Sequence, residues 1–217
     1  MSLSFFDSHA HLQLEDYKAD LESVMEESTR DLHLSRMVNV GIDLESSIQS
    51  IQLAERYPGI IFPSAGIHPN NTQAVGQPEL DQLETILRRY QHTIKALGEI
   101  GLDYYRDYSK PEKQRWCFIQ QLQLARDHQL PIIIHSRNAF EDTWKILQDH
   151  LPPFYPVVFH CFSGDLPELE KVIESHYYVG IAGPVTFSNS RLPHILPEIP
   201  LSHLMIETDS PFLAPVP

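Results

Sequence analysis

The sequence is poor in basic residues and cysteine, and this limits what the protein can do. Its 16 Lys and Arg residues are outnumbered by 29 Asp and Glu residues, which gives a formal net charge of −13. So acidic a chain does not offer the broad basic surface that holds nucleic acid, and a phosphate-containing substrate would need local attraction. The two cysteines, Cys117 and Cys161, provide no disulfide framework, and we interpret them as free thiols in a reducing compartment.

Sequence signals for membranes and nucleotide cofactors are also lacking. No stretch of about 18 apolar residues could cross a bilayer, and the first residues do not resemble a signal peptide. The segment Gly98 to Gly101 lacks the spacing of a dinucleotide-binding loop, and no phosphate-loop lysine motif occurs. We therefore expect a cytoplasmic protein with no membrane partner, and no segment indicates an obligate protein partner.

Short apolar runs alternate with helical patterns along the whole chain. We expect strands near Phe5 to Ala10, Met37 to Val40, Ile60 to Ala65, Ile94 to Leu97, Ile132 to His135, Val157 to His160, Tyr177 to Ile181 and Leu204 to Glu207. We expect helices at Glu15 to Thr29, Leu44 to Tyr57, Pro78 to Tyr90, Pro111 to His128, Ala139 to His150 and Leu166 to His176. This alternation predicts an α/β protein with a parallel sheet, and eight strands favour a closed (β/α)8 TIM-type barrel in one domain over residues 1–217.

Potential metal ligands recur at the ends of these apolar runs. They are His9, His11, Glu99, His135, His160 and Asp209. Each histidine alone could be a satisfied core residue, and a His-x-His pair could occur by chance on a half-exposed strand. Parallel strands of a barrel bring their carboxyl ends together at one place, however, so six such residues predict one catalytic metal centre.

Local patterns support this prediction. On the first strand, alternation places Asp7, His9 and His11 on one face, so two imidazoles can hold one ion. Glu99 is expected where a buried strand opens into a glycine-containing loop, and a buried Glu without a partner is costly.

Six segments resemble the motifs of the TatD-type metal-dependent deoxyribonucleases, which belong to the amidohydrolase-like barrels. The segments are Asp7 to Leu12, Gly66 to Pro69, Gly98 to Asp103, Pro131 to Arg137, His160 to Gly164 and Glu207 to Pro211. They cover essentially the whole chain in the family's order. The resemblance implies a hydrolase of phosphodiester bonds in DNA, acting as a 3′–5′ exonuclease on single strands.

The resemblance also implies two divalent ions, for which Mg, Mn and Zn all remain candidates. By that resemblance His9, His11 and Asp209 bind one ion, His135 and His160 bind the second, and Glu99 bridges them. A water between two ions loses its proton near neutral pH and can attack phosphorus.

Three residues are candidates for the chemistry itself: Glu99, Asp209 and His68. Asp209 is the expected general base, and the alternative is a purely structural ligand. His68 would touch a phosphate or protonate the leaving oxygen, unless it is a loop histidine stiffened by Pro69.

Substrate contacts are expected from residues beside the ligands. Arg137 would clamp a phosphate bidentately, or else pair with an acid on the barrel rim. Ser163 and Gly164 offer a hydroxyl and backbone amides suited to an anion.

Two further sets of residues have supporting roles. Asp103 and Glu207 are interpreted as acids that orient ligand imidazoles. Tyr104, Tyr105 and Phe162 either stack an unpaired base or pack their loops.

Two other functions compete with the nuclease. One is an amidohydrolase-type enzyme that cleaves a C–N, lactone or phosphotriester bond in a small molecule, and the other is a scaffold with a residual metal site. Related barrels often bridge their ions with a carbamylated lysine, so Glu99 at that position favours the nuclease.

The chain departs from the resembled family at its end. The family usually continues through an Arg-Gly and Asn-Glu-Pro segment into a final helix, and this sequence stops at Pro217. We therefore expect the last outer helix to be missing. The outward residues of the terminal strands, which would then be uncovered, are Phe6, Ser8, Ala10, Leu204 and Ile206.

Overall fold

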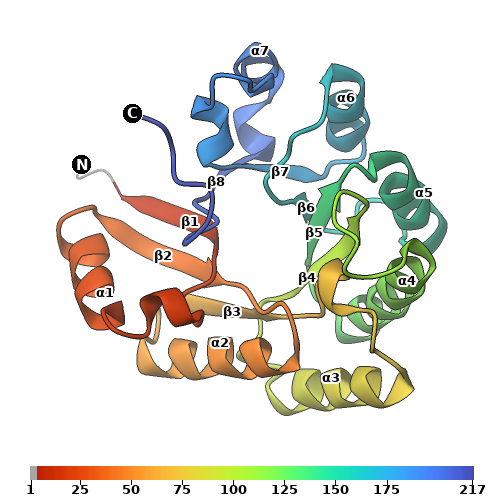
Figure 1. The fold of residues 1–217 in the computed structure, drawn as a ribbon, viewed down its shortest axis with the longest axis horizontal. Helices are drawn as coiled ribbons and strands as arrows, with labels where there is room; N and C mark the ends of the chain where they lie inside the picture. The colour runs from red at the N-terminus through yellow and green to blue at the C-terminus, as the bar shows by residue number, and fades with distance from the viewer. Residues whose placement is uncertain (1–3) are drawn as a thin grey trace.

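Eight parallel strands form a ring in the order of the chain, from β1 to β8, in a computed structural model that describes residues 4–217 (Figure 1). The strands are β1 (Phe5–Ala10), β2 (Leu34–Asn39), β3 (Ile61–Ala65), β4 (Ala96–Asp103), β5 (Ile132–Arg137), β6 (Val157–Phe159), β7 (Tyr178–Ile181) and β8 (Leu204–Ile206). The nearly closed barrel confirms the predicted (β/α)8 fold class.

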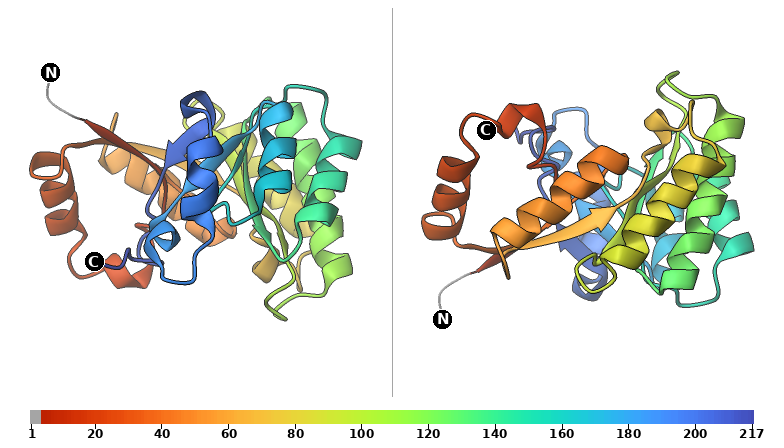
Figure 2. Two further views of the ribbon diagram at one scale, coloured as in Figure 1. Left: turned by 90° about the horizontal axis from the view of Figure 1, so that it is seen from above. Right: turned by 90° about the horizontal axis from the view of Figure 1, so that it is seen from below.

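Helices surround the ring on its outside, as the two further views show (Figure 2). They are α1 (Leu21–Arg30), α2 (Leu44–Arg56), α3 (Gln77–Arg89), α4 (Pro111–His128), α5 (Phe140–His150), α6 (Leu166–Glu174) and the short α7 (Leu192–Ile195). The predicted helix Glu15 to Thr29 is divided into a 3-10 turn, η1 (Glu15–Tyr17), and α1, because Asp20 has a non-helical φ of −137°. No helix among residues 4–217 is long and apolar enough to cross a membrane.

Strand β5 shows how the pleat positions functional side chains. Ile132 and Ile134 pack in the main apolar cluster together with Phe118 of α4, whereas Ile133 belongs to a small cluster inside the ring. His135 is in phase with Ile133, because side chains of a strand alternate between its two faces. The same apolar run that builds the core therefore directs an imidazole into the carboxyl end of the barrel.

Strand β4 is longer than predicted and places its acid differently. The expected strand Ile94 to Leu97 is in fact Ala96–Asp103, so Glu99 lies within the strand and not at its exit. The two glycines on either side of it permit a close approach to β5: an added Cβ would lie 2.6 Å from Ile133 Cβ at Gly98 and 2.1 Å from the His135 carbonyl oxygen at Gly101. These contacts bring Glu99 close to the end of β5.

Within residues 4–217, backbone hydrogen bonds join β1 to the segment after β8 at the carboxyl end of the barrel. A single bridge pairs Ala10 with Ser210, and the backbone N–H of Asp209 donates to the His9 carbonyl oxygen at 2.9 Å. Closure thus takes place at the candidate metal ligands themselves, where the segment after β8 lies beside β1 (Figure 1).

The expectation that the outward residues of the terminal strands are uncovered is confirmed only in part. Residues 207–217 form no helix, and Phe6 and Ile206 are 40% and 51% exposed. The expectation that Ser8 and Ala10 are uncovered is wrong, because both are buried. The Ser8 hydroxyl donates to Glu207 Oε2 at 3.1 Å, so the segment after β8 covers this part of β1.

The packing of β4 against β5 predicts a large cost for a single methyl group at Gly101. Gly101→Ala combines a φ of +137° with overlap on the His135 carbonyl oxygen, and we expect it to lower the free energy of unfolding by at least about 3 kcal/mol. Urea denaturation measures this change. Gly59→Ala is the matched control, since Gly59 has a φ of +80° but no atom within 4 Å of an added Cβ, and about 1 kcal/mol is expected there. Equal costs at both positions would contradict this account.

Candidate metal centre

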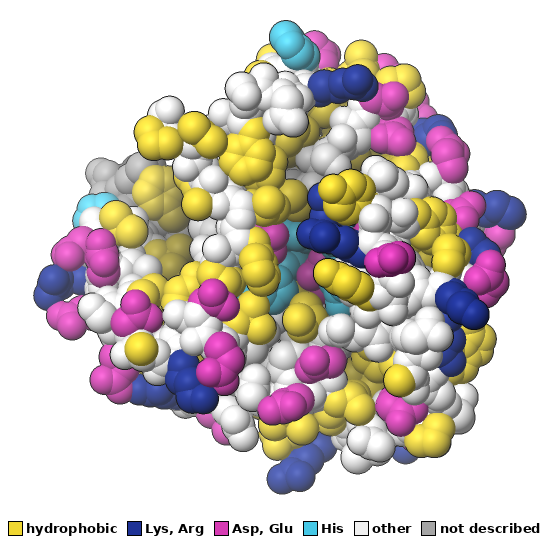
Figure 3. All heavy atoms as spheres, viewed as in Figure 1, with side chains coloured by type: hydrophobic (Ala, Val, Ile, Leu, Met, Phe, Trp, Pro, Cys, Tyr) yellow, Lys and Arg dark blue, Asp and Glu magenta, His cyan; other side chains and the backbone are white. Residues whose placement is uncertain are grey.

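The predicted ligands come together at the carboxyl end of the barrel. Histidine side chains are visible at the centre of this face, with basic side chains directly beside them (Figure 3). Three overlapping groups have ligand atoms within 4.8 Å of one another: His9, His160 and Asp209; His9, His11 and Glu99; and His68, Glu99 and His135. All six predicted ligands and His68 thus lie in one cluster.

The two carboxylate oxygens of Glu99 face different imidazoles. Its Oε2 lies 3.4 Å from His9 Nε2 and 3.9 Å from His11 Nε2. Its Oε1 lies 2.7 Å from His135 Nδ1, 3.6 Å from His68 Nε2 and 3.9 Å from His160 Nε2. Glu99 therefore stands between two sets of imidazoles.

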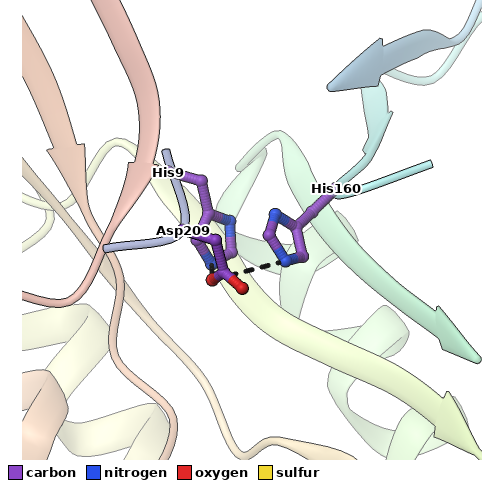
Figure 4. A group of neighbouring side chains, drawn as sticks. All are labelled: His9, His160 and Asp209. Carbon is purple, nitrogen blue, oxygen red and sulfur yellow. Dashed lines mark ion pairs between the residues drawn. The ribbon is translucent and has the colours of Figure 1, made fainter. Parts of the chain in front are cut away.

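Asp209 lies beside His9 and His160 (Figure 4). Its Oδ1 is 3.4 Å from His11 Nε2, 3.7 Å from His9 Nε2 and 3.6 Å from His160 Nε2. The rings of His9 and His160 stack with centroids 3.5 Å apart. His160 therefore lies near both Glu99 Oε1 and the His9 ring. Of the three groups given above, the one that contains His160 does not include His135.

The donor set fits a divalent cation. The Nε2 atoms of His9 and His11 point at each other across 3.1 Å, and ligand atoms about 2.1 Å from one tetrahedral ion stand roughly 3.4 Å apart. His11 Nδ1 is 2.9 Å from the Val40 carbonyl oxygen, to which it can donate, and this leaves Nε2 free to bind a cation. Imidazole and carboxylate together suit zinc, manganese, iron or magnesium.

Two acids hold ligand imidazoles from behind, where the sequence placed them. Asp103 Oδ2 lies 3.1 Å from His135 Nε2, and Glu207 Oε1 lies 2.9 Å from His160 Nδ1. Glu207 Oε1 also accepts a hydrogen bond from the Cys161 backbone N–H at 2.6 Å. Both carboxylates are buried and supply negative charge close to the candidate ligands, and Asp103 also orients the His135 ring.

Sequence reasoning missed other supporting contacts. Asp7 accepts from the Thr208 hydroxyl at 2.7 Å and from the Thr208 N–H at 3.1 Å, which fastens β1 to the segment carrying Asp209. The Asn70 N–H donates to His68 Nδ1 at 3.1 Å, so a neutral His68 carries its proton on Nε2. The motif position of Asp7 was a signal, but nothing in the sequence names its partner.

The charges of the cluster shift its titration strongly. Burial alone would raise the pKa of Glu99, but the neighbouring His68 and His160 hold that pKa well below its usual value. Burial and the charge of His135 lower the pKa of His68 to about 3. Burial would also lower the pKa of His160, but Glu207, Glu99 and Asp209 raise it to about 10.

A cavity of about 460 Å³ opens beside the cluster between the loops after β4, β5 and β6. Its walls include His160, Ser163 and Gly164. Arg137 does not line this cavity; its guanidinium lies over the Tyr105 ring, 3.9 Å from the centroid. The three predicted substrate residues are therefore near the cluster but in two separate places.

Comparisons with known proteins agree with this geometry. The model of the family described as "TatD related DNase" matches residues 6–217. A Bacillus subtilis protein named "Uncharacterized metal-dependent hydrolase YabD" is 36% identical over 98% of this chain and 82% of its own length. An Erwinia tasmaniensis protein named "3'-5' ssDNA/RNA exonuclease TatD" is 32% identical over 97% of this chain and 81% of its own. The crystal structure of the TatD homologue YjjV from Escherichia coli superposes with a TM-score of 0.90 at 30% identity, covering 96% of this chain and 80% of that one.

The contact between Glu207 and His160 predicts that a substitution of Glu207 lowers the affinity for metal although every candidate ligand is retained. In Glu207→Gln the His160 imidazole loses its buried anionic neighbour, so the affinity for Mn²⁺ or Zn²⁺ should fall about 10- to 100-fold. Isothermal titration of the metal-free protein measures this. Glu170→Gln removes an exposed acid of α6 and should leave the affinity unchanged. A normal affinity in Glu207→Gln would refute the supporting role.

The raised pKa of His160 predicts how the stability of metal-free protein depends on pH. A group whose pKa rises from 6.5 to about 10 on folding contributes stability that is complete below pH 6.5. That contribution is lost as the pH rises through about 10. Urea unfolding in a chelator at several pH values should show this decline, and His160→Gln should flatten it. His194→Gln, at an exposed position outside the cluster, should retain the decline of the wild type.

Proposed function

This chain belongs to the TatD-related DNase family and is a metal-dependent hydrolase, and we propose that it cleaves phosphodiester bonds of single-stranded nucleic acid. The mode of attack that we propose is that of a 3′–5′ exonuclease, the activity for which the Erwinia tasmaniensis relative is named. The observation that carries the proposal is Glu99, whose two oxygens face separate sets of imidazoles.

We propose that the cluster holds two divalent ions on either side of Glu99. His9, His11 and Asp209 would hold one ion, and His135 and His160 the other. Paired ions at such a site stabilise charge on phosphoryl oxygens and lower the pKa of water.

We propose roles in the reaction for Asp209 and His68. Asp209 is the general base: burial would raise its pKa, but His11, His160 and His9 lower it, so the group is a carboxylate at neutral pH and can accept a proton. His68 is neutral at that pH because its pKa is about 3. Its Nε2–H can donate a hydrogen bond to a phosphoryl oxygen, which favours this role over proton transfer to the leaving group.

Substrate contacts are proposed at two positions, one at Arg137 and the other in the cavity lined by Ser163 and Gly164. Arg137 is exposed at the end of β5, two residues beyond His135, and we propose that it contacts a phosphate. Ser163 and Gly164 line the cavity together with acids such as Glu168. A sugar and base suit these walls better than a second phosphate does.

The bridging position predicts that Glu99 matters more for metal content than any single terminal ligand. Glu99→Gln should remove most of both ions and lower cleavage of single-stranded DNA by at least about 10³-fold, whereas His9→Ala and His135→Ala should mainly lose one ion each. Metal analysis and gel-based cleavage at matched ionic strength measure the two effects. Near-normal metal and rate in Glu99→Gln would sink the two-ion proposal.

A grid of metals and substrates separates the proposed nuclease from its competitors. Mg²⁺, Mn²⁺ and Zn²⁺ would each be tested with single-stranded DNA, single-stranded RNA, and small lactones, amides and phosphotriesters. Hydrolysis of the small molecules without cleavage of nucleic acid would favour the amidohydrolase-type alternative. Metal binding without any hydrolysis would favour a scaffold.

A further inference from the structure

We propose that the loop after β4, residues 104–108, forms with Arg137 a subsite that stacks a nucleobase next to the scissile phosphate. In this subsite Tyr105 and Tyr108 offer ring faces to bases, and Arg106 and Arg137 hold the adjoining phosphates. The inference rests on the proposed action on single-stranded nucleic acid and names the residues that would select such a strand.

The two tyrosines are exposed to an unusual degree for rings beside a buried site. Tyr105 is 56% exposed and Tyr108 is 60% exposed. Neither belongs to an apolar cluster of residues 4–217. By contrast, Tyr57 and Tyr90, which also lie under an arginine, pack against such clusters with their rings. Stabilising the fold therefore accounts for Tyr57 and Tyr90 but not for the rings of this loop.

Two arginines accompany these rings without an acidic partner. The Arg137 guanidinium lies 3.9 Å from the Tyr105 centroid, and that of Arg106 lies 5.4 Å from Tyr105 and 6.0 Å from Tyr108. Neither arginine forms an ion pair within the part of the chain that the structure describes. In a protein of net charge −13, free cations beside the histidine cluster provide the local attraction that a phosphate backbone needs.

The loop is attached to the metal centre through one carboxylate. Asp103 Oδ2 lies 3.1 Å from His135 Nε2, and its Oδ1 accepts from the N–H groups of Tyr105 at 2.9 Å and Arg106 at 3.0 Å. Asp103 also lies opposite Arg137 in the backbone register of β4 and β5. One side chain thus sets the position of the stacking loop relative to a candidate ligand.

The far end of the loop is fixed as well. The buried Ser109 shares a hydrogen bond of 2.6 Å with the Thr72 hydroxyl, and its carbonyl oxygen accepts from Gln114 Nε2 at 2.9 Å. Buried polar contacts at both ends hold the loop in place, so binding would cost little conformational entropy of the loop.

Aromatic rings alternating with cations suit a single strand in particular. Base–aromatic stacking needs an unpaired base with a free face, and it tolerates any sequence, while the arginines follow the backbone. In a duplex the base faces are stacked inside and unavailable. The subsite would therefore favour single strands through Tyr105 and Tyr108, and DNA or RNA equally.

The test compares binding of two fluorescent strands of equal length and charge, decathymidine and its abasic analogue, in a chelator so that no hydrolysis occurs. Wild type should bind the strand with bases about tenfold more tightly. Tyr105→Leu should lose most of that ratio, and Tyr105→Phe should keep it. Arg106→Gln and Arg137→Gln should weaken both strands equally and each reduce the slope of log K against log salt by about 0.7.

Phe154→Leu is the matched control, since Phe154 is 72% exposed in the loop between α5 and β6, at the other end of the barrel. It should behave as wild type. A ratio unaffected by Tyr105→Leu, or an equal loss on both strands, would overturn the subsite. If wild type cleaves single strands but binds decathymidine and its abasic analogue equally, the subsite is refuted and the proposed function is retained. A ratio that depends on Tyr105 without cleavage by any divalent ion would leave binding but refute the nuclease.

Discussion

A carboxylate buried among five imidazoles is the constraint on which this barrel depends. Glu99 is 3% exposed, and burying an unpaired charge of this kind is prohibitively costly. The cost is offset only if His9, His68 and His135 reach it from three other places in the chain. A closed parallel barrel brings such residues together, because every strand ends at the same rim.

Local packing turns that general property into a site of defined geometry. The contact between Gly101 and the His135 carbonyl oxygen sets the distance between β4 and β5. On the opposite side, the hydrogen bond from Thr208 to Asp7 fastens β1 to the segment after β8. It lies next to the hydrogen bond that the Asp209 backbone N–H donates to the His9 carbonyl oxygen. The seam between β1 and the segment after β8 is thus closed beside the candidate ligands His9 and Asp209.

The sequence predicts the strands and helices well, and also the residues that gather at the carboxyl end of the barrel, but it predicts their mutual geometry poorly. Apolar runs that end in an acid or imidazole identify His135 and Asp209, because a strand's pleat and its exit are local properties. Glu99 was misplaced at a strand end, since the length of β4 depends on how Gly98 and Gly101 pack on a strand more than 30 residues away. The burial of Ser8 likewise depends on Glu207, about 200 residues along the chain.

An acidic surface is compatible with the proposed phosphate substrate because of where the positive charge would be located. A net charge of −13 slows the approach of any polyanion, and salt would screen that repulsion over about 10 Å. Bound cations, together with Arg106 and Arg137, which form no ion pair within residues 4–217, would concentrate the attraction at the carboxyl end of the barrel. Binding then requires a strand whose backbone can bend towards this end, because the surface around it is acidic. A flexible single strand can do so, whereas a stiff duplex would keep most of its phosphates over acidic surface. Electrostatics and base stacking would therefore both favour the proposed single-stranded substrate, each by a different physical means.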